Sequence, residues 1–397
     1  MSPPSSTVAR RRPPAPGDRG RASYPTWNAG DLRAKPSSDP LVPLPAQPTG
    51  TAWPTDDWPE GDVPAGVELD GLLEAVCDDS GPLASTFAVV VVAGGRVVAE
   101  RYQGRLEHLD RPAEDIGPAT PLLSWSMAKS MLHAVVGTLV ADGRLSITDA
   151  AAVAEWGVKD DPRRVITVDQ LLLMRDGLAF VEDYVDDQIS DVIQMLFGPG
   201  RPDMAHFAAD RPLAAVPGER FNYSSGTTNI ISGIVARLLG PGEPYEAYLA
   251  ERLFGPIAMS SARPGFDDAG TWTASSYVHA TARDFARFGL LYLRDGVWDG
   301  QRVLPEGWVD YGRQPRSVDP SDGSLYGAHW WVVGDEHGTF RCAGYNGQSI
   351  TVCPALDLVV VRLGSTPAEH YPDLIAWRAA MVDAFAGPRR ASPQAPS

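Results

Sequence analysis

One serine and one lysine have the spacing that nucleophilic catalysis needs. Ser126 precedes Lys129 by three residues, and Lys129 is one of only three lysines in the sequence. Residues i and i+3 share a helix face, so the two side chains can touch if a helix begins here. A helix N-terminus also favours the negative charge of an alkoxide or a tetrahedral oxyanion. This pattern predicts a serine hydrolase with Ser126 as nucleophile and Lys129 as base.

Lys129 can accept a proton only in its neutral form, which requires a special environment. Residues 126–141 are apolar on nearly all sides, a pattern typical of a buried helix, and Gly143 is placed to end it. Burial disfavours the ammonium form and lowers a lysine pKa from about 10.4. The alternative is a surface lysine that follows a serine by chance. Spacing alone leaves this open, and the apolar neighbours favour catalysis.

Two other segments offer matching groups. Tyr223 lies in a polar run before an expected helix from Thr227, and it could relay a proton between Ser126 and a leaving group. Alternatively, it is a loop tyrosine beside a serine N-cap. The run 342–348 (CAGYNGQ) could supply a backbone N–H that pairs with that of Ser126 in an oxyanion hole. Its alternative is a glycine-rich turn between strands.

The elements that must position these groups are mixed. Residues 87–92 and 96–102 form β-rich runs joined through two glycines, which predicts a hairpin. Residues 151 to about 265 are expected to be mainly helical. Later elements are expected as a helix from about 281 to 293, strands at 329–333, 339–343, 349–353 and 358–363, and a closing helix at 372–385. We therefore expect an α/β (α+β) fold in which helices flank an antiparallel sheet interrupted by a helical lobe, with the site between the lobes.

Composition limits the class of protein. The formal charge of −16 would repel phosphate backbones, so nucleic acid is not expected as a partner. There is no run of eighteen apolar residues, so no membrane partner is expected. Three widely spaced cysteines and seven unclustered histidines suggest neither a disulfide framework nor a metal site. We expect a cytoplasmic enzyme that needs no cofactor and acts on a small-molecule substrate. Its assembly is left open, with a homodimer as one option.

The two ends differ in composition from the middle. Residues 1–48 are rich in Pro, Ser, Ala, Gly and Arg, which is typical of disorder, and residues 387–397 resemble a second tail. The hydrolase domain is therefore expected at 49–386, with its helical lobe at about 151–265.

Taken in order, these segments resemble the serine β-lactamase and penicillin-binding protein superfamily. The similarity is to its class C-like branch, which includes carboxylesterases, D-aminopeptidases and 6-aminohexanoate-dimer (nylon-oligomer) hydrolases. The matching runs are SWSMAKS at 124–130, LLLMRDGLAFVE at 171–182, YSS at 223–225, TARDFARFG at 281–289 and YGAHWW at 326–331. The resemblance covers roughly residues 50–386 and implies a β-lactamase-like fold.

The resemblance also implies roles for individual residues. Ser126 would be acylated, Lys129 would activate it, and Tyr223 would shuttle the proton. The N–H groups of Ser126 and Tyr345, next to Gly344, would hold the oxyanion. Two further residues would contact substrate: Ser225, where the class C pattern has Asn and the nylon-oligomer branch has Ser, and Tyr184, which resembles a tyrosine that closes over the amide. The alternative for Tyr184 is a tyrosine packed on the surface of the helical lobe.

One departure from the superfamily pattern bears on substrate. The third motif, Lys-Thr-Gly or His-x-Gly in many relatives, is Cys342-Ala-Gly344 here, so no cation stands there to hold a substrate carboxylate. This argues against penicillins. Asp186, Asp187 and Asp191 are candidates to hold a substrate amine. A linear amide or ester substrate is favoured, with a β-lactamase, a D-aminopeptidase or carboxypeptidase, and a non-catalytic binding protein as alternatives.

Overall fold

The computed structural model describes residues 40–78, 80–107, 112–185 and 189–387. Its main sheet is antiparallel, with the strand order β10-β11-β12-β13-β14-β15-β1-β2. These strands are β1 (Thr86–Ala93), β2 (Arg96–Tyr102), β10 (Ser317–Val318), β11 (Leu325–Tyr326), β12 (Trp331–Val332), β13 (Phe340–Gly344), β14 (Gln348–Cys353) and β15 (Leu358–Gly364). The expected fold class, an antiparallel sheet flanked by helices, is confirmed.

Smaller strand pairs lie outside the main sheet. They are β3 (Arg105–Leu106) with β4 (Glu114–Asp115), β8 (Val297–Trp298) with β9 (Gln301–Arg302), and the set β5 (Leu122–Leu123), β7 (Val278–Ala280) and β6 (Arg263–Pro264). In the last set, β7 pairs with β5 immediately before the segment that carries Ser126. This pairing fixes the entry to the segment that carries Ser126.

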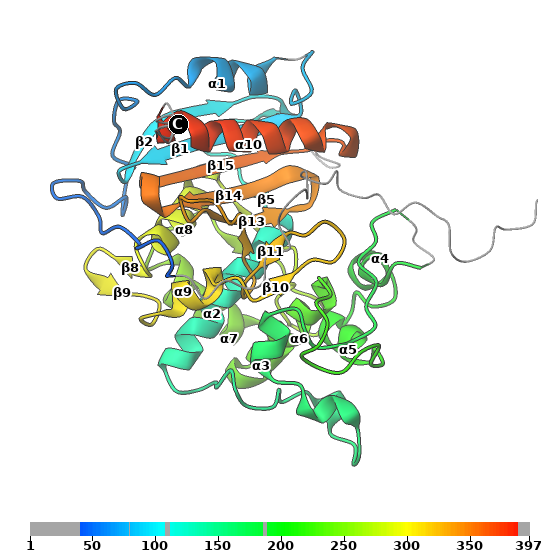
Figure 1. Ribbon diagram of the computed structural model, residues 1–397. Coiled ribbons are helices and arrows are strands. Elements are labelled where there is room, and N and C mark those ends of the chain that lie inside the picture. Colours follow the sequence, from blue (N-terminus) through cyan, green and yellow to red (C-terminus); the bar gives the residue numbers. More distant parts are fainter. Residues whose placement is uncertain (1–39, 79, 108–111, 186–188, 388–397) are drawn as a thin grey trace, which may run out of the picture.

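The helices cover both faces of the sheet (Figure 1). They are α1 (Asp70–Cys77), α2 (Ala128–Ala141), α3 (Val168–Leu172), α4 (Asp191–Phe197), α5 (Met204–Ala209), α6 (Ser225–Leu239), α7 (Glu243–Leu249), α8 (Ala282–Leu293), α9 (Trp308–Arg313) and α10 (Tyr371–Ala386). Helices α1 and α10 pack on one face and α8 on the other, whereas α3 to α7 lie farther from the sheet, beyond α2. The valine run of β1 follows from this arrangement, because Val89 and Val91 face α10 while Val90 and Val92 face the larger core.

Several local predictions are confirmed. Strands β1 and β2 form the expected hairpin, with register Val90 opposite Glu100. Within the region expected to be helical, Thr167 and Gln170 form a capping box at the start of α3. Helix α8 begins after its N-cap Thr281, whose hydroxyl accepts the N–H of Asp284. The chain therefore follows local capping signals wherever they are strong.

The strand expected at 329–333 is shorter than its composition suggests, because only Trp331 and Val332 belong to β12. His329 adopts a left-handed backbone with φ of 58°, and its Nδ1 contacts the carbonyl oxygen of Leu172 at 2.8 Å. This buried anchor bends the chain away from the sheet, so the β-rich composition does not extend the strand.

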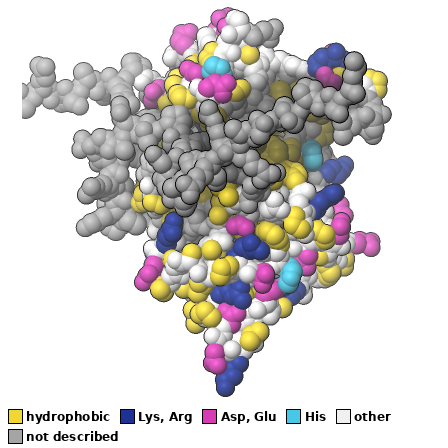
Figure 2. All heavy atoms as spheres, turned by 90° about the vertical axis from the view of Figure 1, so that its right-hand side faces the viewer, with side chains coloured by type: hydrophobic (Ala, Val, Ile, Leu, Met, Phe, Trp, Pro, Cys, Tyr) yellow, Lys and Arg dark blue, Asp and Glu magenta, His cyan; other side chains and the backbone are white. Residues whose placement is uncertain are grey.

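Contacts begin earlier in the chain than the boundary expected at residue 48. The carbonyl oxygen of Val42 accepts a hydrogen bond from Arg313, and Gln47 Oε1 accepts one from Arg294 at 2.8 Å. The remainder of the expected N-terminal tail, and the C-terminal tail from 388, lie outside the described residues. On the face shown in Figure 2, basic side chains of the described residues are interspersed with acidic ones.

Candidate active site

Ser126 lies in a single 3₁₀ turn, η1 (Trp125–Met127), that leads directly into α2. Trp125 has a positive φ of 46°, a conformation that costs a non-glycine residue roughly 1–2 kcal/mol. The strain is held in place by the neighbouring chain, since the N–H of Ser124 donates to Val278 O at 2.8 Å and its hydroxyl to Ser276 O at 3.2 Å. Such strain beside a polar side chain is characteristic of functional sites.

The side chain of Lys129 reaches back from the first turn of α2 to Ser126. Its Nζ lies 3.0 Å from Ser126 Oγ, 3.0 Å from Ser225 Oγ and 3.0 Å from the carbonyl oxygen of Ser275. Lys129 is only 2% exposed, and Ser126 is 8% exposed. Burial lowers the pKa of Lys129 to about 8, while the negative charge of Glu182 acts in the opposite direction. The neutral amine required of a base is therefore accessible near physiological pH.

A carboxylate that sequence reasoning left without a role lies on the far side of Ser225. Glu182 Oε2 accepts the backbone N–H of Ser225 at 2.8 Å. Its Oε1 accepts the hydroxyl of Ser225 at 2.6 Å and that of Tyr184 at 2.8 Å. The signals in the sequence are its place at the end of the matching run 171–182 and its position two residues before Tyr184, whereas Ser225 is 43 residues away along the chain.

Aromatic rings enclose the other side of the cluster. Lys129 Nζ lies 5.0 Å from the ring centroid of Tyr223, within the range of a cation–π contact. The ring of Tyr184 stacks on that of Tyr345 at 4.8 Å, and Tyr345 meets Trp125 edge-on at 5.3 Å. Burial, followed by the charge of Glu182, raises the pKa of Tyr184 well above its ordinary value. Tyr184 is therefore neutral at physiological pH and donates to Glu182.

Strand β13 ends against the segment that carries Ser126. A Cβ on Gly344 would lie 2.4 Å from Ser124 O and 3.0 Å from Trp125 Cβ, so only glycine allows this approach. Tyr345 follows at once in a second 3₁₀ turn, η5 (Tyr345–Gly347). The backbone of Tyr345 is thereby brought to the start of α2, as a shared oxyanion hole with Ser126 requires. That pairing stays a prediction.

The seven residues predicted from the sequence to act in catalysis or to contact the acyl group lie in this one region. They are Ser126, Lys129, Tyr184, Tyr223, Ser225, Gly344 and Tyr345. Of the candidates for an amine site, Asp191 is engaged elsewhere, because it accepts from Arg211 at 3.0 Å and from the N–H of Val181. Asp186 and Asp187 lie outside the described residues.

Other titratable groups near the cluster are poor candidates for the base. Burial lowers the pKa of His329 to about 3, and its ring contacts Leu172 O and Thr228 Oγ1, so it is a neutral structural residue. Cys342 is 1% exposed, and burial raises the pKa of its thiol to about 12, so it supplies no charge. Over the described residues, no group of three His, Cys, Asp or Glu side chains is arranged to hold a metal ion.

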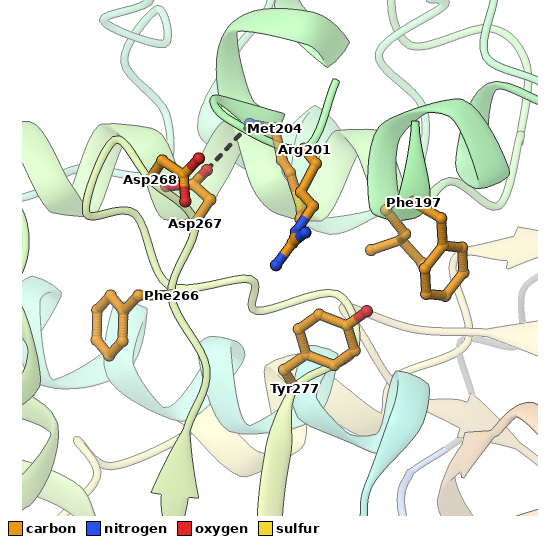
Figure 3. A pocket seen from close by; sticks show the side chains of 8 residues that line it. Phe197, Arg201, Met204, Phe266, Asp267, Asp268 and Tyr277 are labelled. Carbon is orange, nitrogen blue, oxygen red and sulfur yellow. Dashed lines mark hydrogen bonds between the residues drawn. The ribbon is translucent and has the colours of Figure 1, made fainter. Parts of the chain in front are cut away.

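A pocket of about 350 Å³ lies between α4, the start of α5 and the segment 266–277. Its lining residues are Leu196, Phe197, Arg201, Met204, Phe266, Asp267, Asp268 and Tyr277. Figure 3 shows the Arg201 guanidinium pointing into the space above the ring of Tyr277, with Phe266 on one side and Phe197 on the other. Tyr277 is two residues beyond Ser275, whose carbonyl contacts Lys129, and two residues span at most about 7 Å. No pattern in the sequence indicates this pocket, because its walls come from separate segments of the chain.

The polar groups of this pocket are not equally available to a ligand. Both oxygens of Asp267 are occupied, because Oδ1 accepts the N–H of Thr271 and Oδ2 that of Met204. Arg201 and Asp268 are exposed, and among the described residues neither makes a side-chain ion pair. The pocket therefore offers one free cation, one free anion and aromatic walls.

Comparison with known proteins places this fold and site in a known class. The model of the Beta-lactamase family matches residues 83–384, which is most of the chain. The chain belongs to the Beta-lactamase family, and with it to the serine hydrolase superfamily of the β-lactamase and penicillin-binding protein type. The resemblance inferred from the motifs is confirmed.

Individual relatives refine this placement. The chain is 30% identical over 332 residues to the 6-aminohexanoate-dimer hydrolase of Paenarthrobacter ureafaciens, covering 78% of this chain and 77% of the relative. A putative 6-aminohexanoate-dimer hydrolase from Bacillus anthracis superposes with a TM-score of 0.68 at 22% identity, covering 87% of this chain and 90% of that one. An octameric penicillin-binding protein homologue from Pyrococcus abyssi superposes with a TM-score of 0.62 at 20% identity, covering 79% and 77%. The two structural neighbours support the fold alone. In the described part of the chain, no helix is long and apolar enough to cross a membrane.

Proposed function

We propose that this protein hydrolyses linear amides or esters through a covalent acyl-enzyme on Ser126. The observation that carries the proposal is the contact of 3.0 Å between Ser126 Oγ and the buried Nζ of Lys129, whose pKa is lowered to about 8. A buried lysine is costly to a fold unless it is paired or used. Here it touches a serine hydroxyl next to a strained backbone turn, which suits nucleophilic catalysis.

The first half of the reaction forms the acyl-enzyme. Neutral Lys129 takes the hydroxyl proton of Ser126 as Oγ bonds to the substrate carbonyl carbon, and the carbonyl π electrons move to oxygen. The N–H groups of Ser126 and Tyr345 receive the resulting oxyanion. When the tetrahedral intermediate collapses, the bond to the leaving group breaks. Tyr223 passes the proton from the Lys129 ammonium to the departing nitrogen or oxygen.

The second half releases the acid. A water molecule attacks the ester carbonyl of the acyl-enzyme and gives its proton to Lys129, by way of Tyr223. The second intermediate expels Ser126 Oγ, which recovers that proton, and the carboxylic acid leaves. The two halves balance with water as co-reactant: its hydroxyl goes to the acid, and its proton restores the Ser126 hydroxyl, whose own proton has gone to the leaving group.

We further propose that the pocket lined by Tyr277 receives part of the substrate, because Tyr277 is two residues from Ser275, whose carbonyl oxygen contacts Lys129. Its aromatic and aliphatic walls suit a chain of methylene groups, and the Arg201 guanidinium can hold a terminal carboxylate by two hydrogen bonds. Cys342 supplies no charge to the site. A linear oligoamide such as the substrate named for the Paenarthrobacter relative would meet these demands, and esters are easier chemistry for the same nucleophile.

Alternatives within the family are β-lactam, D-amino-acid amide and peptide hydrolysis. A steady turnover of a cephalosporin that exceeds that of every linear amide and ester would favour a β-lactamase. The other alternative is a binding protein on the same scaffold. The joint presence of Ser126, Lys129 and Tyr223 in contact distance argues against it, because binding alone does not need a paired nucleophile and base.

The experiment is a comparison of wild type and Ser126→Ala on p-nitrophenyl butyrate and on 6-aminohexanoate dimer. We expect wild type to turn over at least one of them and Ser126→Ala to show no turnover above background. The preferred substrate separates esterase from oligoamidase. A folded wild type that turns over neither compound, nor a cephalosporin or D-alanyl peptide, would contradict the proposal.

A further inference from the structure

The three contacts of Lys129 can be matched to the three hydrogens of its ammonium form. Nζ lies 3.0 Å from each of Ser126 Oγ, Ser225 Oγ and Ser275 O. The charged amine donates to all three acceptors and has no lone pair. When Lys129 loses a proton to become a base, it keeps two N–H groups and gains one lone pair. That lone pair must face one of the three oxygen atoms.

Two of the three oxygens cannot face the lone pair. Ser275 O is a carbonyl oxygen, which can only accept. Ser225 Oγ has a hydrogen, but that hydrogen is donated to Glu182 Oε1 over 2.6 Å. Towards Lys129, Ser225 therefore also acts as an acceptor. Ser126 Oγ is the remaining contact, and its hydrogen is the one that the reaction removes.

We propose that Glu182 is a positioning residue of the reaction, which acts through Ser225 to aim the lone pair of Lys129 at Ser126 and to stabilise the ammonium that forms. The inference rests on the proposed function of the Ser126 site. Ser225 Oγ lies within 3.0 Å of Nζ and 2.6 Å of the carboxylate oxygen, so the two charges are less than about 6 Å apart. Opposite charges at this separation interact strongly where water is excluded.

The other titratable groups around Lys129 are neutral, so Glu182 supplies the negative charge that acts on the ammonium. From the segment before α6 comes Tyr223, whose ring faces Nζ. From the loop before β12 comes His329, which burial keeps neutral. Tyr184 lies beyond Glu182 and donates its hydroxyl to the same carboxylate oxygen as Ser225. Its pKa is raised, so it adds a hydrogen bond but no charge.

The geometry also shows why the carboxylate is rigid. Its two oxygens receive three hydrogen bonds, from the N–H and hydroxyl of Ser225 and from the hydroxyl of Tyr184. The N–H of Ser225 fixes the carboxylate to the first residue of α6. Glu182 therefore keeps the Ser225 hydrogen turned away from Lys129 throughout the cycle, at no reorganisation cost during catalysis.

The test uses Glu182→Gln and two readouts. Because the negative charge of Glu182 favours the ammonium, its removal should move the acidic limb of the kcat/KM profile to lower pH by about one unit. The limiting kcat should fall about 10-fold or more for two reasons. The introduced amide can donate as well as accept, so it no longer fixes the direction of the Ser225 hydroxyl, and it carries no charge to stabilise the Lys129 ammonium. If Glu182 had only a structural role, Glu182→Gln would lower kcat but leave the acidic limb of the kcat/KM profile at its wild-type pH. That result would overturn the inference.

A direct titration separates this inference from the proposed function. With Lys35→Arg and Lys159→Arg, Lys129 is the only lysine left, so [ε-¹³C]lysine labelling gives one NMR signal whose pH titration reports the pKa of Lys129. We expect that titration to move down by about one unit in Glu182→Gln, whether or not a substrate has been found. An unchanged titration overturns the inference, whereas a lack of Ser126-dependent turnover in wild type overturns the proposed function.

Two matched variants complete the design. Asp183→Asn removes a neighbouring carboxylate whose Oδ1 accepts the N–H of Val185, so it should leave both the limb and kcat near wild type. Ser225→Ala keeps the charge of Glu182 but removes the oriented hydroxyl. It should lower kcat about 10-fold while moving the limb by less than about half a unit. If Glu182→Gln does not fold, an unchanged kcat in Ser225→Ala overturns the inference by itself.

Discussion

Replacing Lys129 with methionine should abolish activity and change the free energy of unfolding by an amount that depends on pH. In the folded chain the pKa of Lys129 is lowered from 10.5 to about 8, because the buried ammonium is poorly solvated. One pKa unit corresponds to about 1.4 kcal/mol, so burial of this amine costs the wild type roughly 3 kcal/mol below pH 8. Methionine has a similar length and carries no charge, so it escapes this cost.

The cost is offset by hydrogen bonds that the variant lacks. Loss of the contacts to Ser126 Oγ, Ser225 Oγ and Ser275 O should cost about 1 kcal/mol each. Below pH 8 these losses should offset the gain, so Lys129→Met and wild type should have similar free energies of unfolding. Between pH 8 and 10.5 the unfolded chain binds a proton that the folded chain does not, so the wild type gains stability as pH rises. Near pH 10.5 the variant should be the less stable of the two.

The assay is urea unfolding of both proteins at pH values from 7 to 10.5, with hydrolysis measured alongside. At each pH the free energy of unfolding of one protein is subtracted from that of the other. The contributions of titratable groups that the substitution does not affect then cancel. Lys159→Met is the matched control, because Lys159 is exposed and its removal should give a difference that does not vary with pH. A difference in free energy of unfolding between Lys129→Met and wild type that stays constant from pH 7 to 10.5 would refute the argument. A variant that keeps its hydrolytic activity would refute it as well.

The remaining predictions concern neighbouring groups. Tyr223→Phe should lower kcat about 100-fold with little change in KM, because the ring stays over Lys129 while the proton relay is lost; steady-state kinetics test this. Gly344→Ala should lower both the unfolding midpoint and kcat, since its Cβ would lie 2.4 Å from Ser124 O; a destabilisation of about 1–3 kcal/mol is expected, and wild-type values would contradict the close approach. Arg201→Gln should raise KM about 10-fold for 6-aminohexanoate dimer but not for the same dimer capped as its C-terminal amide; equal changes for both would rule out a carboxylate contact.

Much of the fold could be predicted because its signals are local. The valine run of β1, the glycine pair of the first hairpin and the Thr167 capping box each determine structure within a few residues. The short β12 was mispredicted for the opposite reason. Its backbone is bent by His329, whose buried contacts to Leu172 and Thr228 come from distant parts of the chain.

The candidate site divides in the same way. Ser126 and Lys129 are three residues apart, so helix geometry alone predicts their contact, and the structure has Nζ 3.0 Å from Oγ. The partnership of Glu182 with Ser225 joins positions 43 residues apart and has no periodic signature. The pocket around Arg201 is likewise made by tertiary packing. Residues that act through others, or that line a space, are recognised only once the fold places them.

The central claim, a covalent intermediate on Ser126, is tested most directly by intact-protein mass spectrometry. Wild type and Ser126→Ala would each be incubated with a fluorophosphonate, and the labelled peptide would be mapped. We predict one adduct per chain in wild type, located on Ser126, and none in Ser126→Ala. A folded wild type that takes no label, or a label that persists in Ser126→Ala, would contradict the account.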